Sequence, residues 1–276
     1  MIKKTMGMEA SGDRAAFTEV LPRRTLSSLI LPSVVREACS ELVEEHHRGD
    51  LLRSHGLEPR HRVLLSGPPG NGKTTLAEAL AFELTVPLYV VRYESIIGSY
   101  LGETAVRLAK LFAQVRTERC VLFFDEFDVV GKERGDVHET GEIKRVVSSL
   151  LLQVDQLPSH VVVVAATNHS ELLDRAAWRR FQVRLPLPVP TREQRVEWLT
   201  RFEARAGFSL GHSHSNLAKT LGAISFADLE VFALDVQRRY VLALPDVDAR
   251  SIVSQRLKQW NARVRPKTGT TRKRDG

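Results

Sequence analysis

Nine residues, 67 to 75, with the sequence "GPPGNGKTT" combine the residue types that bind a polyphosphate. Their glycines permit backbone angles closed to other residues, so successive N–H groups can converge on one point. The spacing fits G-x-x-x-x-G-K-[ST], in which the lysine meets the outer phosphates and the hydroxyl suits magnesium. An ordinary Gly/Pro turn is the alternative interpretation. The stretch predicts an ATP site formed by Gly67, Pro68, Pro69, Gly70, Asn71, Gly72, Lys73, Thr74 and Thr75.

Two adjacent carboxylates form the second group of residues that could take part in a reaction. In "CVLFFDEFD" five apolar residues end in Asp125 and Glu126. Ligands of open α/β sheets bind at the carboxyl ends of strands. We expect Asp125, with Thr74, to hold Mg²⁺, and Glu126 to orient or deprotonate an attacking water. Acidic residues often simply follow a buried strand, but together with the phosphate loop they favour nucleotide triphosphate hydrolysis.

These groups require a parallel sheet to bring them together. Apolar runs predict strands at 62–66, 87–92, 120–125 and 161–167, and periodic segments predict helices within 31–56 and at 73–84, 104–116 and 142–157. Alternating strands and helices indicate an α/β fold, a mainly parallel sheet with helices on both faces as in P-loop NTPases. From Thr191 onward the pattern is helical.

The chain divides into four predicted segments. A length of 276 residues with 43% hydrophobic content suits one large domain and one smaller one. The proline-rich "LPLPVPT" marks a boundary near Pro186. We expect an N-terminal arm at 1–28, a nucleotide-binding α/β domain at 29–186, a small helical domain at 187–260 and a basic disordered tail at 261–276.

Charge and composition constrain partners and location. The net charge is +7, but residues 261–276 carry six Lys or Arg and one Asp, so the rest is close to neutral. The tail is either a weak contact to nucleic acid or an acidic partner, or a solubilising end. A secretory signal and an apolar run long enough for a membrane are not recognisable. Cys39 and Cys120 are far apart, as expected of ordinary thiols in a reducing compartment, and we expect a cytoplasmic protein without membrane contact.

From about Leu29 to Leu229 the chain resembles an AAA ATPase in the strict sense, within the AAA+ superfamily, and is similar to small stand-alone bacterial members. The resemblance rests on the phosphate loop, "LFFDEFD", "AATNHSELLDRA" and "SFADLE", in that order. It implies a homo-oligomeric ring, usually a hexamer, with ATP bound between subunits and a protein substrate drawn through a central pore. The helical domain would then be the lid.

The resemblance assigns roles to further residues. Asn168 matches the sensor that helps to position the attacking water. Arg179 and Arg180 match arginine fingers, which reach a neighbouring subunit's site. A guanidinium can neutralise charge that develops on the transferring phosphate. The alternative is that both arginines form surface salt bridges.

A second set of matches concerns the substrate and the lid. Tyr100 and Leu101, flanked by glycines, match the aromatic–aliphatic pair of the pore loop; packing against the sheet is the alternative. Residues 131–145 form either a second pore loop or a solvated connector. In "GAISFADLE", Ala227 follows the lid motif that meets the nucleotide, whereas Phe226 stands where glycine is common and departs from the pattern.

Two functions remain open. The first is a mechanoenzyme that remodels, unfolds or threads a protein. Because fewer than thirty residues precede the family-like region, we expect a separate partner, such as a protease or adaptor, to select the substrate. The second is a nucleic-acid-associated ATP switch or loader, which the near-neutral core disfavours. A protein that binds ATP but barely hydrolyses it is a weaker possibility.

Overall fold

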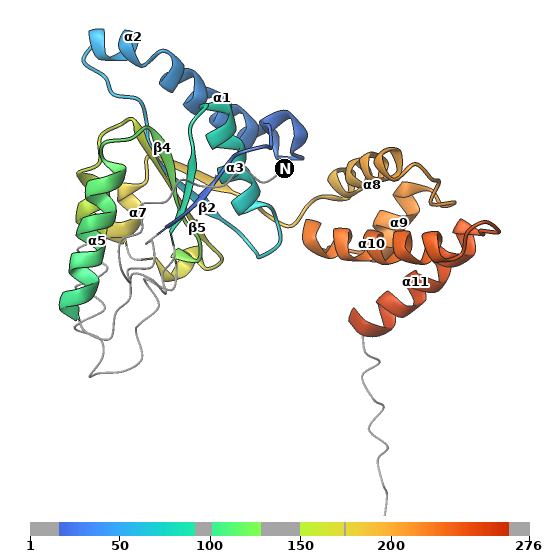
Figure 1. The fold of residues 1–276 in the computed structure, drawn as a ribbon. Helices are drawn as coiled ribbons and strands as arrows, with labels where there is room; N and C mark the ends of the chain where they lie inside the picture. The colour runs from blue at the N-terminus through green and yellow to red at the C-terminus, as the bar shows by residue number, and fades with distance from the viewer. Residues whose placement is uncertain (1–16, 92–100, 128–149, 174, 265–276) are drawn as a thin grey trace, which may run out of the picture. The chain divides into compact units, whose positions relative to one another are not determined.

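The computed structural model describes residues 17–91, 101–127, 150–173 and 175–264. These residues form two compact units (Figure 1). The first, an α/β unit, contains Arg36–Ser66 and Thr74–Leu185. The second contains Ser27–Val35, Gly67–Lys73 and, among the described residues, 186–264. The bounds of the four predicted segments remain predictions.

The α/β unit is built on a six-stranded sheet with the order β1-β3-β4-β5-β2-β6. Its neighbours β3–β4, β4–β5 and β5–β2 pair in parallel, whereas β1 pairs antiparallel with β3. The predicted mainly parallel α/β fold is therefore confirmed, with an antiparallel edge strand that the sequence did not reveal. The strands are β1 (Phe17–Val20), β2 (Arg62–Ser66), β3 (Leu88–Val91), β4 (Cys120–Phe124), β5 (Val161–Thr167) and β6 (Val183–Pro186).

Helices cover both faces of this sheet, with α5 on one side and α1 and α3 on the other (Figure 1). The segment predicted as one helix within 31–56 forms two, because the backbone leaves helical geometry at Arg48, with φ −107° and ψ 26°. Residues 150–155 are also helical. The helices of this region are α1 (Ser33–His47), α2 (Gly49–Ser54), α3 (Lys73–Glu83), α5 (Leu101–Val115) and α7 (Arg175–Arg180), with 3-10 turns η1 (Leu26–Ser28) and η3 (Ser170–Leu172).

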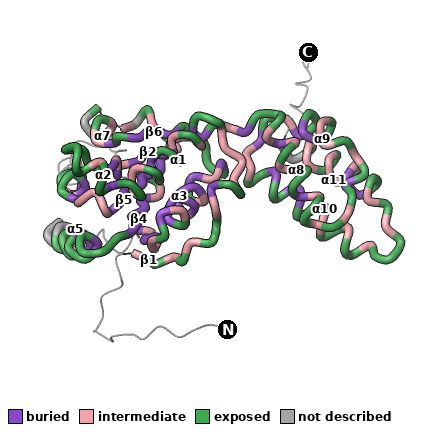
Figure 2. Tube along the Cα trace, turned by 90° about the horizontal axis from the view of Figure 1, so that it is seen from above, coloured by how far each residue is buried: buried purple, intermediate pink, exposed green. Residues whose placement is uncertain are grey.

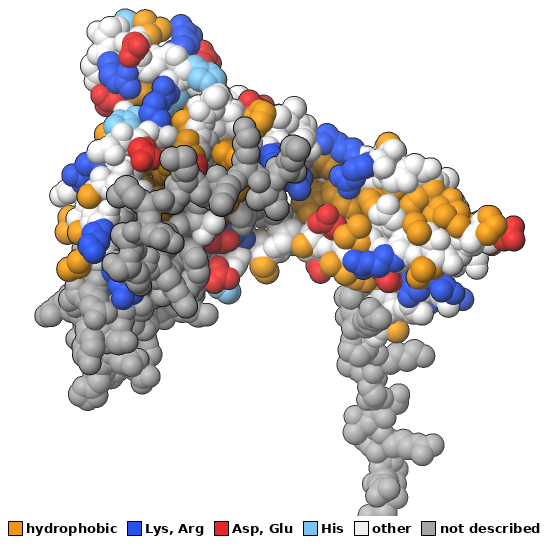
Figure 3. All heavy atoms as spheres, in the orientation of Figure 1, with side chains coloured by type: hydrophobic (Ala, Val, Ile, Leu, Met, Phe, Trp, Pro, Cys, Tyr) orange, Lys and Arg blue, Asp and Glu red, His pale blue; other side chains and the backbone are white. Residues whose placement is uncertain are grey.

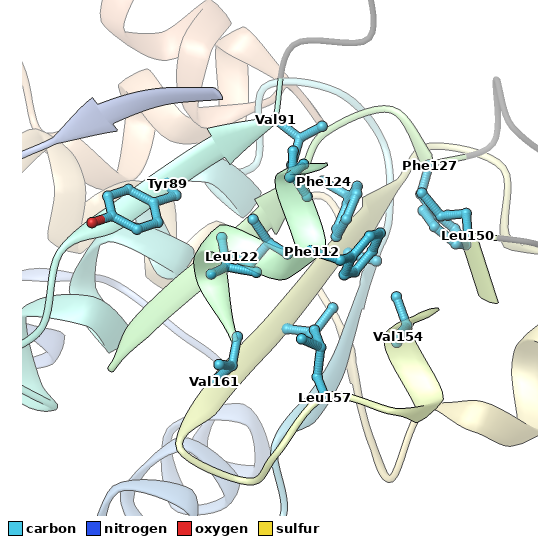
Figure 4. Close-up of a cluster of buried hydrophobic side chains, with 14 of the residues drawn as sticks. Tyr89, Val91, Phe112, Leu122, Phe124, Phe127, Leu150, Val154, Leu157 and Val161 are labelled. Carbon is cyan, nitrogen blue, oxygen red and sulfur yellow. The ribbon is translucent and has the colours of Figure 1, made fainter. Parts of the chain in front are cut away.

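The core of the α/β unit explains why β4, and β5 up to its last residue, are apolar. All residues of β4 and β5 are buried, as expected for strands covered on both faces (Figure 2). On one face, Phe112 of α5 packs with Leu122 and Phe124 of β4 and with Val154 and Leu157 (Figure 4). This packing holds β4 in place, and so it also positions Asp125 and Glu126, which directly follow the strand.

The second unit contains the four C-terminal helices α8 (Arg192–Ala206), α9 (His214–Leu221), α10 (Phe226–Leu242) and α11 (Ala249–Val264). Capping boxes start α8 at Thr191 and α10 at Ser225. Gly207, with φ 73°, ends α8 in the left-handed conformation. A separate core that includes Leu199, Phe232 and Val253 holds the helices together. The predicted small helical domain is confirmed.

Candidate nucleotide-binding site

The glycine-rich loop connects the end of β2 to the start of α3, as the sequence predicts. Gly67 has φ 144°, and a Cβ there would lie 2.1 Å from the carbonyl oxygen of Leu187. Gly70 has φ 76°, and a Cβ there would lie 2.8 Å from Ser225 Oγ. Only glycine satisfies both the backbone angle and the close approach at these positions. Pro68 and Pro69 are exposed, Gly72 and Thr75 are partly exposed, and all four lie in or beside this turn.

Two buried polar side chains lie within the loop. Lys73 is only 7% exposed, and its Nζ donates hydrogen bonds to the carbonyls of Gly67 at 2.7 Å and Pro68 at 3.1 Å. Asn71 is 4% exposed, and neither its amide nitrogen nor its amide oxygen has a hydrogen-bond partner among the described residues. Buried polar atoms are normally paired. A cationic group and an unsatisfied amide therefore fit a loop that receives a polar, anionic ligand.

The α/β unit brings the predicted magnesium residues together. Thr74 Oγ1, in the first turn of α3, donates a hydrogen bond to Asp125 Oδ2 at 3.2 Å. The other oxygen of Asp125 accepts the backbone N–H of Glu126 at 2.9 Å. Glu126 is exposed, with φ 50°, a left-handed conformation that is uncommon outside glycine and concentrates at functional sites. Hard oxygen donors of this kind suit Mg²⁺.

Asn168 lies at the same edge of the sheet. It directly follows β5, whose last residue Thr167 is in register with Ser66, the residue before the glycine-rich loop. The side chain of Asn168 is half-buried. The parallel register thus brings the predicted sensor position level with the end of β2.

The two predicted arginine fingers end α7, at the opposite end of β2. Arg180 Nε donates to Asp155 Oδ2 at 2.8 Å, while Arg62 Nη1 donates to Asp155 Oδ1 at 2.6 Å. The backbone N–H of Gln182 donates to the carbonyl of Arg62, the first residue of β2, at 2.9 Å. Arg180 thus forms an ion pair, one of the two interpretations that the sequence allows. Arg179 is exposed.

Sequence reasoning missed the aromatic contacts that support the turn after β4 and the end of α7. Phe127 follows Glu126, and Phe181 follows Arg180; both are buried. Their rings meet edge to face, with centroids 5.7 Å apart, and Phe127 also meets Phe124 at 6.2 Å. The turn that carries Glu126 and the end of α7 are therefore anchored in one aromatic cluster. Nor does any spacing in the sequence point to Asp155.

In the second unit the start of α10 contacts the glycine-rich loop. The backbone N–H of Ala227 donates to the carbonyl of Gly70 at 3.0 Å. Ala227 is exposed, and Phe226, which departs from the family pattern, is half-buried as the first residue of α10. The lid motif and the loop are thus neighbours.

Several predicted sites fall outside the described residues. Tyr100, residues 131–145 and the basic tail from 265 are among them. Leu101 begins α5, and its side chain is likewise not described.

Within the described ranges no group of three or more His, Cys, Asp or Glu could hold a metal ion. Cys39 and Cys120 are buried, and burial raises the pKa of both thiols to about 12. No helix in the described part of the chain is long and apolar enough to cross a bilayer.

The loop, the paired carboxylates and the parallel sheet define a P-loop protein that binds nucleoside triphosphates. Residues 63–189 match the model of the "ATPase family associated with various cellular activities (AAA)". A putative 26S proteasome regulatory subunit homolog of Methanothermobacter marburgensis is 30% identical over 260 residues, which are 92% of this chain and 69% of that protein. The chain belongs to the AAA family of ATPases.

Further similarities agree with this assignment. An uncharacterized AAA family ATPase of Sinorhizobium fredii, y4kL, is 44% identical over 174 residues, 63% of this chain and 52% of the relative. The FtsH 3 ATP-dependent zinc metalloprotease of Sphaerobacter thermophilus is 32% identical over 83% of this chain and 47% of its own. The chain thus spans about half the length of these two relatives. The FIGL-1 AAA domain, crystallised with ADP, shares the fold, with a TM-score of 0.69, 23% identity and coverage of 91% of this chain and 88% of that one.

Proposed function

We propose that this AAA ATPase hydrolyses Mg²⁺-ATP in a ring of identical subunits and uses the energy to remodel a protein substrate. The glycine-rich loop and Lys73 would bind the phosphates, with Ala227 near the nucleotide. Thr74 and Asp125 would hold Mg²⁺, which shields phosphate charge when bound. Glu126 would orient or deprotonate the attacking water, and Asn168 would help to position it.

The position of Arg180 is the observation that carries this proposal. Arg180 is held beside Arg62, at the amino end of β2, whereas Thr74 and Asp125 follow the carboxyl ends of β2 and β4. The five residues of β2 rise by roughly 3.3 Å each, so about 13 Å separates its first and last Cα atoms. An arginine held there serves a neighbouring subunit's nucleotide more readily than its own. Head-to-tail sharing of sites between identical subunits forms a ring when the rotation closes, and the family suggests six subunits.

Protein remodelling is supported by the relatives. They include a putative proteasome regulatory subunit homolog, ATP-dependent zinc metalloproteases and a cell division cycle protein 48 homolog of Archaeoglobus fulgidus. We propose that Tyr100 and Leu101 grip the substrate in the pore, because aromatic rings supply contact area at low entropic cost. A separate protease or adaptor would deliver or receive it, in the cytoplasm.

Nucleic-acid loading is the second candidate, and charge disfavours it. On the face shown in Figure 3, Lys and Arg side chains are interspersed with Asp and Glu over both units. Phosphate backbones normally bind to clustered cations. Stimulation of ATP hydrolysis by DNA, falling steeply with salt, would favour this candidate instead.

Mixing two inactive variants tests the shared site. Glu126→Gln should bind ATP and hydrolyse it very slowly, and Arg180→Ala should lose activity although its own pocket fills. If the sites are shared, a mixture restores turnover, because an Arg180→Ala pocket then receives an intact arginine from a Glu126→Gln neighbour. Turnover that never exceeds the sum of the two variants, and activity per subunit that is independent of concentration, would contradict the ring.

A trapping experiment tests the substrate. Tagged Glu126→Gln protein is purified with ATP from its own cells after nuclease treatment, and bound molecules are identified by mass spectrometry. If the protein threads its substrate, proteins should be recovered with the Glu126→Gln variant. They should be lost when Tyr100→Ala is combined with Glu126→Gln in one chain. Proteins retained without Tyr100 would contradict the pore-loop role. Material lost on nuclease treatment would favour the nucleic-acid candidate.

A further inference from the structure

We propose that Asp155 is a positioning residue, which orients Arg180 for its action on the nucleotide of the neighbouring subunit. This inference rests on the proposed function. Asp155 ends the helical residues 150–155, and each of its carboxylate oxygens accepts a hydrogen bond from a different arginine. The side chains of Arg180 and Asp155 are 26% and 32% exposed, so they lie at the surface while partly enclosed.

The bond to Asp155 acts on the part of Arg180 that determines its direction. An arginine side chain is long and flexible, and its guanidinium is a planar fork. A charge-assisted hydrogen bond at Nε, 2.8 Å long, restricts the plane of that fork. Asp155 therefore orients the guanidinium before it meets a phosphate, which lowers the entropy lost on engagement.

Arg62 explains why Asp155 itself is fixed. The Nη1 of Arg62 donates to the second oxygen of Asp155 at 2.6 Å, and Arg62 is the first residue of β2, which lies between β5 and β6 in the sheet. The resulting chain, from β2 through Arg62 and Asp155 to Arg180, ties the finger to the rigid sheet. A surface ion pair contributes little to stability. The network is better suited to orientation than to folding.

The backbone around Arg180 has its own supports. Gln182 N–H bonds the carbonyl of Arg62 at 2.9 Å, and Phe181 is buried against Phe127. The Cζ of Arg184, in β6, lies 5.2 Å from the ring centroid of Trp178, which belongs to α7. Removing the Asp155 carboxylate should thus remove the bond at Nε of Arg180 while α7 stays in place.

Asp155→Asn tests the orientation. We expect kcat for ATP to fall about tenfold or more, because a misplaced catalytic group is costly in rate. The KM for ATP and the ATP-induced rise in melting temperature should be unchanged, and Asp155→Glu should recover part of the activity. Asp50→Asn is the matched control, since it removes a carboxylate 2.7 Å from Arg53 and should leave kcat as it is. A normal kcat in Asp155→Asn would overturn the proposal.

Mixing experiments separate this role from general damage. Asp155→Asn mixed with Glu126→Gln should regain activity above the sum of the two, whereas Asp155→Asn mixed with Arg180→Ala should not, because both lack an effective finger. If only the Arg180→Ala and Glu126→Gln pair recovers, Asp155 does not act through Arg180 and this inference fails alone. If neither Glu126→Gln mixture recovers, the shared site fails and the inference with it.

Discussion

The hydroxyl of Thr74 donates a hydrogen bond to the carboxylate of Asp125 over 3.2 Å. Thr74 lies in the first turn of α3 and Asp125 follows β4, so the contact joins the two segments in which the sequence concentrates its chemistry. Both groups offer oxygen ligands, and Mg²⁺ commonly takes one or two protein oxygens together with phosphate. The contact supports a shared role for Thr74 and Asp125 in binding Mg²⁺.

Thr74→Val should therefore weaken ATP binding only when Mg²⁺ is present. The substitution keeps the shape of the side chain and removes the oxygen. We expect at least a tenfold loss of affinity with Mg²⁺ and little change in excess EDTA, measured by titration with a fluorescent ATP analogue. The titration without metal is the internal control. Equal losses in both conditions would indicate damage to the loop instead.

Lys73→Met should abolish stabilisation by ATP. In the wild-type protein, ATP at a hundred times its Kd stabilises the folded state by about 2.7 kcal/mol, which raises the melting temperature by several degrees. The methionine keeps the length of the side chain but has no charge for the phosphates. Differential scanning fluorimetry with and without ATP measures the shift. A shift of normal size in the variant would rule out the phosphate-binding role of Lys73.

Gly70→Ala should disturb the contact between the loop and α10. An added Cβ would lie 2.8 Å from Ser225 Oγ and 2.9 Å from Ala227 Cβ. We expect at least a tenfold weaker affinity for ATP, in addition to a backbone cost of about 1–2 kcal/mol for a left-handed alanine. Gly56→Ala is the matched control, because Gly56 has φ 74° but nothing within 4 Å of an added Cβ. If both variants bind ATP equally well, the contact with α10 does not matter for affinity.

Acid should weaken the C-terminal unit through Glu203. Burial acts to raise the pKa of this carboxyl, but hydrogen bonds from Ser209, Leu210 and His214 outweigh it and lower the pKa below 4.5. The stabilisation is therefore present above pH 4.5 and is lost as the pH falls through the lowered pKa. Glu203→Gln should lower stability at pH 7 by about 1–2 kcal/mol.

Urea unfolding followed by tryptophan fluorescence measures both effects. Between pH 5 and pH 3, stability should fall less in Glu203→Gln than in the wild-type protein. The control is Glu197→Gln on the same helix, which removes a carboxylate that is 48% exposed. An identical loss of stability on acidification in all three proteins would exclude Glu203 as the source.

The glycine-rich loop, the carboxylates after β4 and the parallel alternation of strands and helices were predictable from sequence. In each case the signal lies in residues that are close along the chain. Turn angles, burial of an apolar run and helix capping depend on near neighbours. Such features can be predicted without knowledge of the packing. The same reasoning identified the AAA family, because its motifs occur in order.

Only the tertiary structure revealed the antiparallel pairing of β1, the contact of Ala227 with Gly70, and the carboxylate of Asp155 between Arg62 and Arg180. These partners are far apart in the sequence, and none has a distinctive spacing. Long-range contacts form because buried strands and helices pack in one arrangement, which then brings surface side chains together. The sequence by itself therefore determined the chemistry of the nucleotide loop, whereas packing decided where the arginines are held.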